Sequence, residues 1–396
     1  MPWRRLLLRL LLVPTTDWLQ PPAPTRLHHV FERVAARNEV HVLRFRLGRG
    51  RGRNTRLVVH EPRGRIHATC WPPTYYLANS LAHMESLRGL LREYDFDVMV
   101  LSNLLPAYAA ARSSAGEPCL FDLSDHFPLS GVEYLPGCGF LRLVGRAFLE
   151  ALLRKTLKHV DLCVASSTTL AEYGARLGAR MVKLIANGVD ESFLSAPFRG
   201  DETREKYGLK DSLVVGFLGA VRGYHNFEPL LGAMKRIAAE VDVKLLVVGP
   251  NRTLSGARLR RRMQQLGLTE RLVQVTDLPA SEVPYHIDVM DICTIPLDAS
   301  TAISRFLYPN KLWEYLARAR PVAATPLPEI LREAGPFIQP AQTEQEYVDV
   351  FRRYGKKAEA FEEVARLARV QAKEHTWSKI AAEYEELLHH VVAEST

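Results

Sequence analysis

The segment PNKLWEYLARAR, residues 309–320, carries charged side chains at a spacing that suits the binding of a phosphorylated ligand. Lys311, Glu314 and Arg318 stand at i, i+3 and i+7, which places them on one face of a helix. On that face Lys311 can contact a diphosphate, and Glu314 can accept hydrogen bonds from a vicinal diol such as a ribose. The same spacing also fits two ordinary surface ion pairs, Lys311–Glu314 and Glu314–Arg318. The residues alone leave both interpretations open.

The start of this helix offers backbone donors as well. Pro309 suits the first helical position, because its missing N–H would be unpaired there anyway. We therefore expect the N–H groups of Asn310, Lys311 and Leu312 to project from the helix start, where the helix dipole favours an anion. The helix N-terminus and Lys311 together predict a diphosphate-binding site.

A second candidate anion site is VVGFLGAVRGYHN, residues 214–226. A strand-like run ends there in a loop with Gly219, and glycine in such a loop lets a phosphate or another backbone approach closely. Arg222 adds a guanidinium that can form two parallel hydrogen bonds, and we expect a helix from about Asn226 to direct further N–H groups at the ligand. The glycine spacing is not that of a dinucleotide-binding loop. A plain turn with a surface arginine stays open as the alternative.

Apolar runs alternate with helix-period segments along most of the chain, which predicts parallel sheets covered by helices on both faces. The expected strands are residues 6–13, 40–45, 97–101, 119–123, 162–165, 213–218, 243–248, 291–295 and 321–325. A polar stretch rich in turn residues follows Asp190 and predicts a domain boundary. The expected fold is α/β, with two tandem Rossmann-like doubly wound domains, residues 1–190 and 191–375, and a ligand cleft between them. Residues 376–396 are expected to form a helix that packs back on the first domain.

Charge and cysteine content narrow the class of protein. Residues 1–190 hold 25 Lys and Arg against 16 Asp and Glu, whereas the remaining residues hold 27 against 28, so the first half carries the whole basic excess. The basic residues are not interleaved with aromatic residues as a single-strand groove requires, so we expect no nucleic-acid partner. The cysteines are scattered and form no C-x-x-C pair, which predicts a reducing compartment and no zinc site. They are Cys70, Cys119, Cys138, Cys163 and Cys293.

Two segments bear on membranes. The N-terminal MPWRRLLLRLLLVP imitates a signal peptide, but Arg9 interrupts its apolar part, so we interpret residues 6–13 as a core strand. Residues 141–159 form an amphipathic pattern with five Lys and Arg among leucines. Such a helix can lie on an anionic membrane surface, or it can pack on the core with a solvated basic face. The expected location is the cytoplasm, with the inner face of the membrane as an alternative place.

The second half of the chain resembles the retaining glycosyltransferases of the GT-B fold, in the large family 4 group that uses nucleotide-sugar donors. The resemblance covers about residues 160–395 and rests on several segments in order. They are NGVD (187–190) followed by Phe193, VGFLG (215–219), VVGP (247–250), PNKLWEYLA (309–317), Pro321-Val322 and Trp377. The first half resembles the family in VPTTDWLQPPAPTRLHHV (13–30) and FDLSDHFP (121–128).

The resemblance implies a reaction. A nucleotide-diphosphate sugar is the co-substrate and binds the C-terminal domain, while a glycan or lipid-linked acceptor hydroxyl binds the N-terminal domain. Transfer retains the anomeric configuration, and the leaving diphosphate helps to deprotonate the acceptor. No metal is expected if Lys, Arg and helix N-termini neutralise the diphosphate. Cell-envelope polysaccharide or glycolipid synthesis is the implied process.

The resemblance also implies roles for residues. Glu314 matches the glutamate that contacts the ribose of the donor. In the first domain Asp125 and His126 are the catalytic-site candidates, with Asp122 beside them. The alternatives are a turn-capping role for Asp125 and a structural role for a half-buried His126.

Asp17 and Arg26 are further candidates for substrate binding in the first domain, on the loop and the helix that follow its first strand. His28 and His29 are expected to be surface or packing residues.

Three positions depart from the family pattern. Phe306 stands where the family has a glutamate that touches the donor sugar, Ala220 where it has an arginine, and His225 where it has a lysine. Arg222 and Lys311 can compensate for the lost cations. The departures leave two alternatives open, a catalytically silent glycosyltransferase-like subunit and a GT-B sugar-nucleotide epimerase.

Overall fold

A computed structural model describes residues 7–21, 24–46, 52–63, 66, 72–112, 116–133, 139–250, 253–356 and 358–395. The chain divides into two compact units. Unit 1 comprises Met1–Asn187 and Trp377–Thr396, and unit 2 comprises Gly188–Thr376. The sequence predicts these divisions after residues 190 and 375.

Unit 1 is built on a seven-stranded parallel sheet with the order β3-β2-β1-β4-β5-β6-β7. Its strands are β1 (Arg9–Val13), β2 (Glu39–Leu43), β3 (Val58–His60), β4 (Val98–Leu101), β5 (Cys119–Leu123), β6 (Leu162–Ala165) and β7 (Val182–Leu184). The strand order reverses between β1 and β4, which makes the carboxyl ends of these central strands the expected place for a ligand. The interior strands are mostly buried and mostly apolar, as parallel strands covered on both faces require, with His41 in β2 and Asp122 in β5 as buried polar exceptions.

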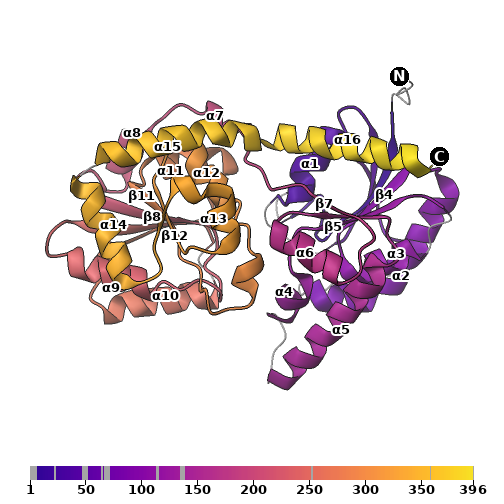
Figure 1. Cartoon of the computed structure of the whole chain (residues 1–396), viewed down its shortest axis with the longest axis horizontal. Coiled ribbons are helices and arrows are strands. Elements are labelled where there is room, and N and C mark those ends of the chain that lie inside the picture. Colours follow the sequence, from indigo (N-terminus) through magenta and orange to yellow (C-terminus); the bar gives the residue numbers. More distant parts are fainter. Residues whose placement is uncertain are drawn as a thin grey trace. The chain divides into compact units, whose positions relative to one another are not determined.

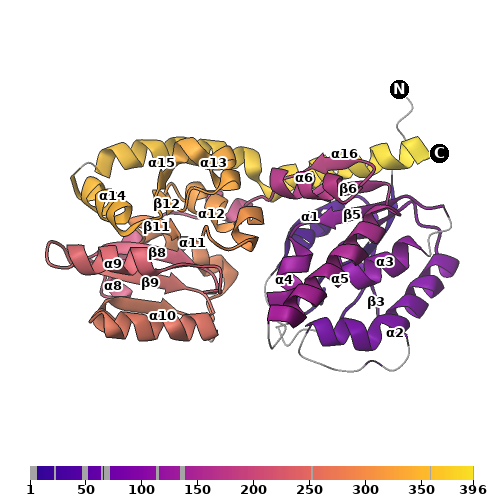
Figure 2. The same cartoon turned by 60° about the horizontal axis from the view of Figure 1, so that its bottom comes forward.

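Helices cover both faces of this sheet. They are α1 (Arg26–Val34), α2 (Pro72–Glu93), α3 (Leu104–Ala111), α4 (Phe127–Glu133), α5 (Gly139–Leu157), α6 (Thr168–Arg176) and α16 (Trp377–Ser395). α1 and α16 pack against each other on one face (Figure 1), where Trp18, Phe31 and Tyr384 join Leu10 and Leu12 of β1 in the core. α2, α3 and α5 lie side by side on the opposite face (Figure 2).

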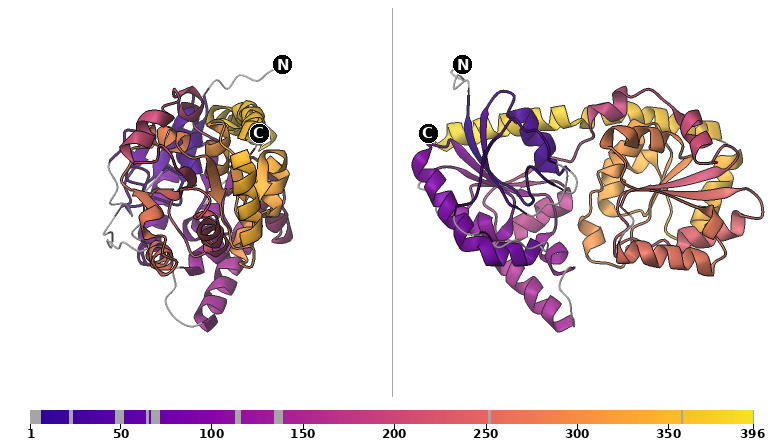
Figure 3. Two further views of the ribbon diagram at one scale, coloured as in Figure 1. Left: turned by 90° about the vertical axis from the view of Figure 1, so that its left-hand side faces the viewer. Right: turned by 180° about the vertical axis from the view of Figure 1, so that it is seen from behind.

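Unit 2 repeats the architecture with a six-stranded parallel sheet, in the order β10-β9-β8-β11-β12-β13. Its strands are β8 (Leu213–Leu218), β9 (Val243–Val248), β10 (Leu272–Val275), β11 (Ile292–Ile295), β12 (Val322–Ala324) and β13 (Ile338–Pro340). Here the order reverses between β8 and β11. Figure 3 shows the parallel strands of both sheets from behind.

The helices of unit 2 are α7 (Glu191–Ser195), α8 (Gly200–Lys206), α9 (Glu228–Ile237), α10 (Leu254–Gln265), α11 (Val283–Asp288), α12 (Lys311–Ala317), α13 (Pro328–Ala334), α14 (Glu344–Lys356) and α15 (Ala358–Ala372). α9, α10 and α14 share one core with one face of β8 and β9, through residues such as Met234, Met263 and Phe351. The predicted fold class, two doubly wound α/β domains, is confirmed.

The element boundaries differ from the expectation in a few places. The first strand begins at Arg9 rather than at residue 6, which lies outside the described residues. The stretch after Asp190, expected to be irregular, contains the short helices α7 and α8. The helix expected from about Asn226 begins at Glu228, and its second residue, Pro229, has no N–H to offer.

Three of the five cysteines lie in the part of the chain that the structure describes. Cys119, Cys163 and Cys293 are buried free thiols, whereas Cys70 and Cys138 lie outside the described residues. In the portion of the chain that the structure describes, no helix combines the length and the apolar composition needed to cross a membrane.

Candidate functional site

The loop after β8 approaches its neighbours closely because of two glycines. Gly219 has a φ of 104°, and its N–H donates to the carbonyl of Val248 at 2.7 Å. Gly249, at the end of β9, has a φ of 137°, and a Cβ there would lie 2.9 Å from the carbonyl of Gly219. Both positions therefore require glycine, which keeps the carboxyl ends of β8 and β9 close together.

Lys311 extends from the first turn of α12 to this loop. Its Nζ lies 3.9 Å from the centre of the Phe217 ring in β8, a cation–π geometry. A Cβ on Gly219 would lie 3.6 Å from the same Nζ, so the ammonium lies directly beside the β8 loop. The side chain is half-buried. Lys311 therefore presents a cation at the carboxyl edge of the unit 2 sheet, as the diphosphate interpretation needs.

Glu314 lies one turn further along α12 and is also half-buried. Within the described residues its carboxylate has no ion pair closer than 4.0 Å and no side-chain hydrogen bond, and the same holds for the ammonium of Lys311. The simple surface ion pair between Lys311 and Glu314 is therefore not formed. Two opposite charges on one helix turn are instead left available to a ligand.

Burial disfavours the charged forms of both Lys311 and Glu314 in the folded protein. Burial lowers the pKa of Lys311 from 10.5 to about 7, although the negative charge of Glu314 works in the opposite direction. Burial likewise raises the pKa of Glu314 to about 7, and the nearby charge of Asp190 adds to the shift. Groups whose ionisation the fold itself disfavours are characteristic of functional sites.

Arg318, which we expected on the same face as Glu314, lies elsewhere. α12 ends at Ala317, and Arg318 turns into the core of unit 2, where it is fully buried. Its guanidinium forms a bidentate pair with Asp288, with contacts of 2.8 and 2.7 Å. The surface pair Glu314–Arg318 is therefore wrong, and Arg318 is a structural residue.

The backbone at the start of α12 is also less open than expected. The helix begins at Lys311, so Pro309 precedes it, and the N–H of Leu312 already donates to the carbonyl of Pro309 at 3.0 Å. Asn310 is exposed at the cap position, and its side chain makes no capping bond. Asn310 remains next to Lys311, where its side chain is accessible to a ligand.

Arg222 is exposed on the loop after β8, next to His225. The Arg222 N–H donates to His225 Nδ1 at 2.9 Å, which assigns the ring proton to Nε2. Burial, together with the charges of Lys311 and Arg222, lowers the pKa of His225 to about 2. His225 is therefore neutral and cannot supply the positive charge of the lysine that it replaces.

Two residues of this site were not singled out in the sequence. Phe217 forms the floor beneath Lys311, and the Tyr315 hydroxyl accepts the N–H of Leu218 at 2.7 Å, which ties α12 to the end of β8. Phe217 belongs to an apolar strand and Tyr315 to the buried face of a helix, so both resemble ordinary core residues. Only the position where β8 ends, which the structure gives, distinguishes these two residues from other core residues.

In unit 1, Asp17 is buried and held by the protein itself. Its carboxylate accepts the N–H groups of Leu19 and Gln20, at 3.0 and 3.2 Å, and pairs with Arg44 at 2.9 Å. These contacts shape the loop after β1 and favour a structural role over substrate binding.

Arg26 is buried as well. It pairs with Asp122 at 3.2 Å and donates to the carbonyl of Ala186 at 2.6 Å and to Asn187 Oδ1 at 3.1 Å. The hydroxyl of Tyr384 in α16 donates to the same Asp122 oxygen at 3.2 Å. Arg26 and Asp122 thus join α1, β5, α16 and the end of unit 1, which also favours a structural role.

Asp125 and His126 follow β5 at the carboxyl edge of the unit 1 sheet. His126 is buried, its ring stacks on Tyr173 at 4.3 Å, and its Nδ1 accepts the N–H of Leu129 at the start of α4. Burial lowers the pKa of His126 to about 4, so it is neutral. Asp125 is half-buried, and burial raises its pKa against the hydrogen bonds from Ser130 and the N–H of His126. The contacts of Asp125 fit a turn-capping role and those of His126 fit a structural role, although His126 is fully buried rather than half-buried. Catalytic roles for both stay predictions.

The structure brings together Gly219, Lys311 and Glu314, with Asn310 and Arg222 at the rim, at the carboxyl edge of unit 2. Among the residues that the structure describes, no three His, Cys, Asp or Glu side chains gather as metal ligands would. The expectation that no metal takes part stays a prediction.

Two doubly wound units with this strand order define a GT-B protein, and solved structures agree. Sucrose-phosphate synthase from Thermosynechococcus elongatus superposes with a TM-score of 0.78 at 15% identity, over 98% of this chain and 100% of that one. HepE from Anabaena, in complex with UDP-glucose, superposes with a TM-score of 0.71 at 15% identity, over 96% and 99%. Likeness at this identity shows the fold.

Sequence matches then give the family. Residues 23–193 match the model of Glycosyltransferase Family 4, and residues 212–354 match that of Glycosyl transferases group 1. With these two domains and this fold, the chain belongs to the GT-B glycosyltransferases. It is 26% identical over 258 residues to the putative teichuronic acid biosynthesis glycosyltransferase TuaH of Bacillus subtilis, which is 60% of this chain and 63% of TuaH. The match therefore spans less than two thirds of that relative.

Proposed function

We propose that this protein is a glycosyltransferase that moves a sugar from a nucleotide-diphosphate donor to an acceptor hydroxyl with retention of the anomeric configuration. The observation that carries the proposal is the pair Lys311 and Glu314, two opposite charges beside the β8 loop that are not paired with each other. A diphosphate bound to Lys311 would restore the charge that burial disfavours. Glu314 would accept the two hydroxyls of the ribose.

The other residues of the site would act around these two. Gly219, which has no side chain, leaves room for the diphosphate beside Lys311, and Arg222 and Asn310 are exposed where they can contact its oxygens. With cations in these positions, the developing charge of the leaving diphosphate can be stabilised by the protein alone, so we propose a reaction without a metal.

The acceptor is proposed to be a glycan or a lipid-linked saccharide of the cell envelope. The name of TuaH, which places that relative in teichuronic acid biosynthesis, supports a polysaccharide. The basic excess of residues 1–190 supports an acceptor that carries phosphate or lies near anionic lipid. HepE was solved with UDP-glucose, which makes uridine nucleotides the first donors to try.

A catalytically silent subunit is the second candidate. The neutral His225 and the apolar Phe306 and Ala220 remove two cations and a carboxylate that the resemblance predicts at the donor site. A silent subunit would retain the fold and would not turn over any donor, with or without a partner.

Thermal stabilisation by nucleotides tests the proposal. UDP, GDP, ADP and their common sugars are added singly to the purified protein, and the apparent Tm is measured. A ligand that binds only the folded state stabilises it by mass action and so raises Tm. At a ligand concentration of a hundred times Kd, the free energy of unfolding rises by about 2.7 kcal/mol. We expect a shift with one nucleotide and a larger one with one of its sugars. A shift without donor turnover would favour the silent subunit, and no shift with any ligand would contradict a donor site in this chain.

Nucleotide binding is expected to take up protons at alkaline pH. Lys311 titrates near 7 in the free protein, and the diphosphate charges would raise its pKa, so at pH 8 binding must protonate it. Affinity should therefore fall as pH rises above 7, by up to about tenfold for each pH unit. Calorimetry at pH 8, in two buffers of different ionisation enthalpy, measures the uptake. Glu314→Gln should still show it and Lys311→Met should not, whereas wild-type binding without uptake would contradict this role of Lys311.

A further inference from the structure

The N-terminal half of α5 exposes large apolar side chains that no part of the described chain covers. Phe140, Leu143 and Phe148 are 69%, 64% and 57% exposed, and Leu141 and Val144 are at least half exposed. Phe140, Val144 and Phe148 stand at i, i+4 and i+8 and so form one stripe along the helix. Contiguous exposed apolar side chains of this size mark an interaction surface.

The C-terminal half of the same helix is anchored. Leu152, Leu153, Thr156 and Leu157 are buried, and α5 packs against α3 and α4. Residues 139–144 are exposed on every side, and this end of α5 extends beyond the neighbouring helices of unit 1 (Figures 1 and 3). The buried C-terminal half of α5 therefore anchors the exposed apolar surface on the N-terminal half of the same helix.

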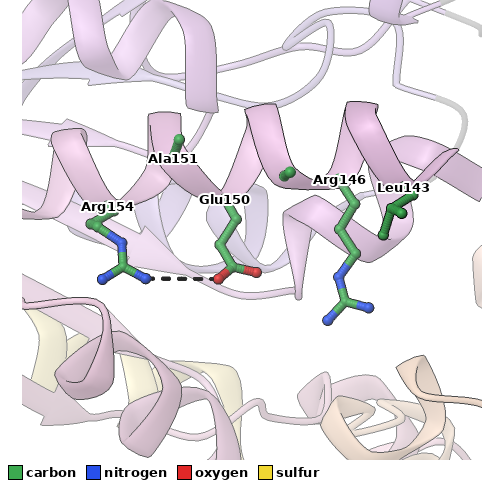
Figure 4. A pocket seen from close by; sticks show the side chains of 6 residues that line it. Leu143, Arg146, Glu150, Ala151 and Arg154 are labelled. Carbon is green, nitrogen blue, oxygen red and sulfur yellow. Dashed lines mark ion pairs between the residues drawn. The ribbon is translucent and has the colours of Figure 1, made fainter. Parts of the chain in front are cut away.

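Cations surround the apolar surface. Arg142 and Arg146 flank it, and Arg154 and Lys155 continue its face toward the C-terminal end, against a single carboxylate, Glu150. Figure 4 shows Arg146, Glu150 and Arg154 extending from one side of α5, together with Leu143. Arg154 and Glu150 pair at 3.8 Å, which leaves a clear positive excess on the helix.

We propose that the N-terminal half of α5 docks unit 1 on an anionic lipid bilayer. Aromatic and aliphatic side chains with Arg and Lys beside them are the composition of helices that lie in the headgroup region. A fluid lipid surface can surround side chains that project on every side of a helix end, which a rigid protein groove cannot do. The basic excess of the first half of the chain adds long-range attraction to anionic headgroups.

The exposed apolar surface of α5 lies at the carboxyl edge of the unit 1 sheet. α5 connects β5 to the parallel strand β6, so it runs against the strands and its N-terminal end lies at the carboxyl edge of the sheet. Asp125 and His126 lie at the same edge. Docking would hold this edge of unit 1 at the membrane surface, where a lipid-linked acceptor would lie. The docking itself does not depend on any donor or reaction.

Vesicle sedimentation tests the docking separately from the proposed reaction. Wild-type protein is mixed with sucrose-loaded vesicles of phosphatidylglycerol and phosphatidylcholine in a one-to-two ratio, or of phosphatidylcholine alone. We expect binding to the anionic vesicles that weakens with salt, and at least about tenfold weaker partitioning for the triple variant Phe140→Ser/Leu143→Ser/Phe148→Ser. The matched control is Leu367→Ser/Val370→Ser on α15 of unit 2, where two apolar side chains that are 48% and 55% exposed are removed. The control should bind as the wild type does.

A second measurement places the helix directly. Phe148→Trp should show a blue shift of tryptophan emission on anionic vesicles and quenching by brominated lipid. Equal binding of wild type and triple variant, equal binding to neutral and anionic vesicles, or no emission shift would overturn the proposal. A lipid-free dimer that the triple variant dissociates, seen by light scattering, would also overturn it and would assign the surface to a second copy of the chain.

Discussion

Replacing Lys311 by methionine is expected to weaken the binding of a nucleoside diphosphate by about 10- to 150-fold, the worth of one or two hydrogen bonds to a charged group. Lys311 presents an ammonium directly beside the β8 loop, and the neutral His225 cannot replace the lost charge. Inorganic pyrophosphate should lose affinity by a similar factor, because the lost contact is to phosphate. Calorimetric titration of both ligands measures the loss.

The same variant is expected to remain folded. The pKa of Lys311 is lowered in the folded protein, so the unfolded chain binds more protons between pH 7 and 10.5, and stability rises with pH across that window. Below pH 7 the charged lysine therefore costs stability, and Lys311→Met should have an equal or higher Tm there without ligand. A Tm that falls at pH 6, or nucleotide binding within about twofold of the wild type, would contradict the account. Arg236→Met, at an exposed pair with Glu344, is the matched control and should change neither quantity.

Replacing Arg318 by methionine is expected to destabilise unit 2 by about 3–5 kcal/mol, the cost of leaving one partner of a buried ion pair without the other. All five N–H groups of the guanidinium are used. Besides the two bonds to Asp288, they donate to the carbonyls of Phe193 at 2.9 Å, Ala196 at 2.7 Å and Pro197 at 3.2 Å. The side chain therefore holds α11 and the end of α12 together with α7 and the chain that follows α7.

For a domain of this size the expected loss corresponds to a Tm lower by about 6–20 °C. Arg318→Lys should recover little of it, because an ammonium has three donors and cannot form the planar pair with Asp288. Scanning calorimetry of both variants makes the test. A Tm within about 2 °C of the wild type would show that the arginine contributes no more than a surface pair.

The interior strands could be predicted from the sequence because they are mostly apolar. β5, β6, β8 and β9 have the predicted bounds, and each is buried over almost its whole length. The four strands that the sequence analysis missed, β3, β7, β10 and β13, are the edge strands of the two sheets. Edge strands have one neighbour and are only three or four residues long here, with several exposed residues, so they carry no continuous apolar run.

The candidate site could be predicted in part, for a similar reason. Lys311 and Glu314 lie on one turn of one helix, so local spacing was enough to relate them. Arg318 was misplaced because the i, i+7 relation assumes a longer helix, and α12 ends one residue before it. The partners of Arg26 could not be predicted, because Asp122 and Ala186 are 96 and 160 residues away in the sequence. Contacts of that sequence separation exist only in the folded chain.

The most direct test of the central claim, a nucleotide-sugar site built on Lys311 and Glu314, combines two proteins with two ligands. UDP and its 2′,3′-dideoxy analogue, or the matching pair for the nucleotide that stabilises the protein, are titrated into wild type and Glu314→Ala. If Glu314 binds the ribose hydroxyls, the variant should weaken the ribonucleotide by about 10- to 150-fold and leave the dideoxy analogue within about twofold. Equal losses for both ligands, or no loss for either, would contradict a ribose contact at Glu314 and with it the proposed orientation of the donor.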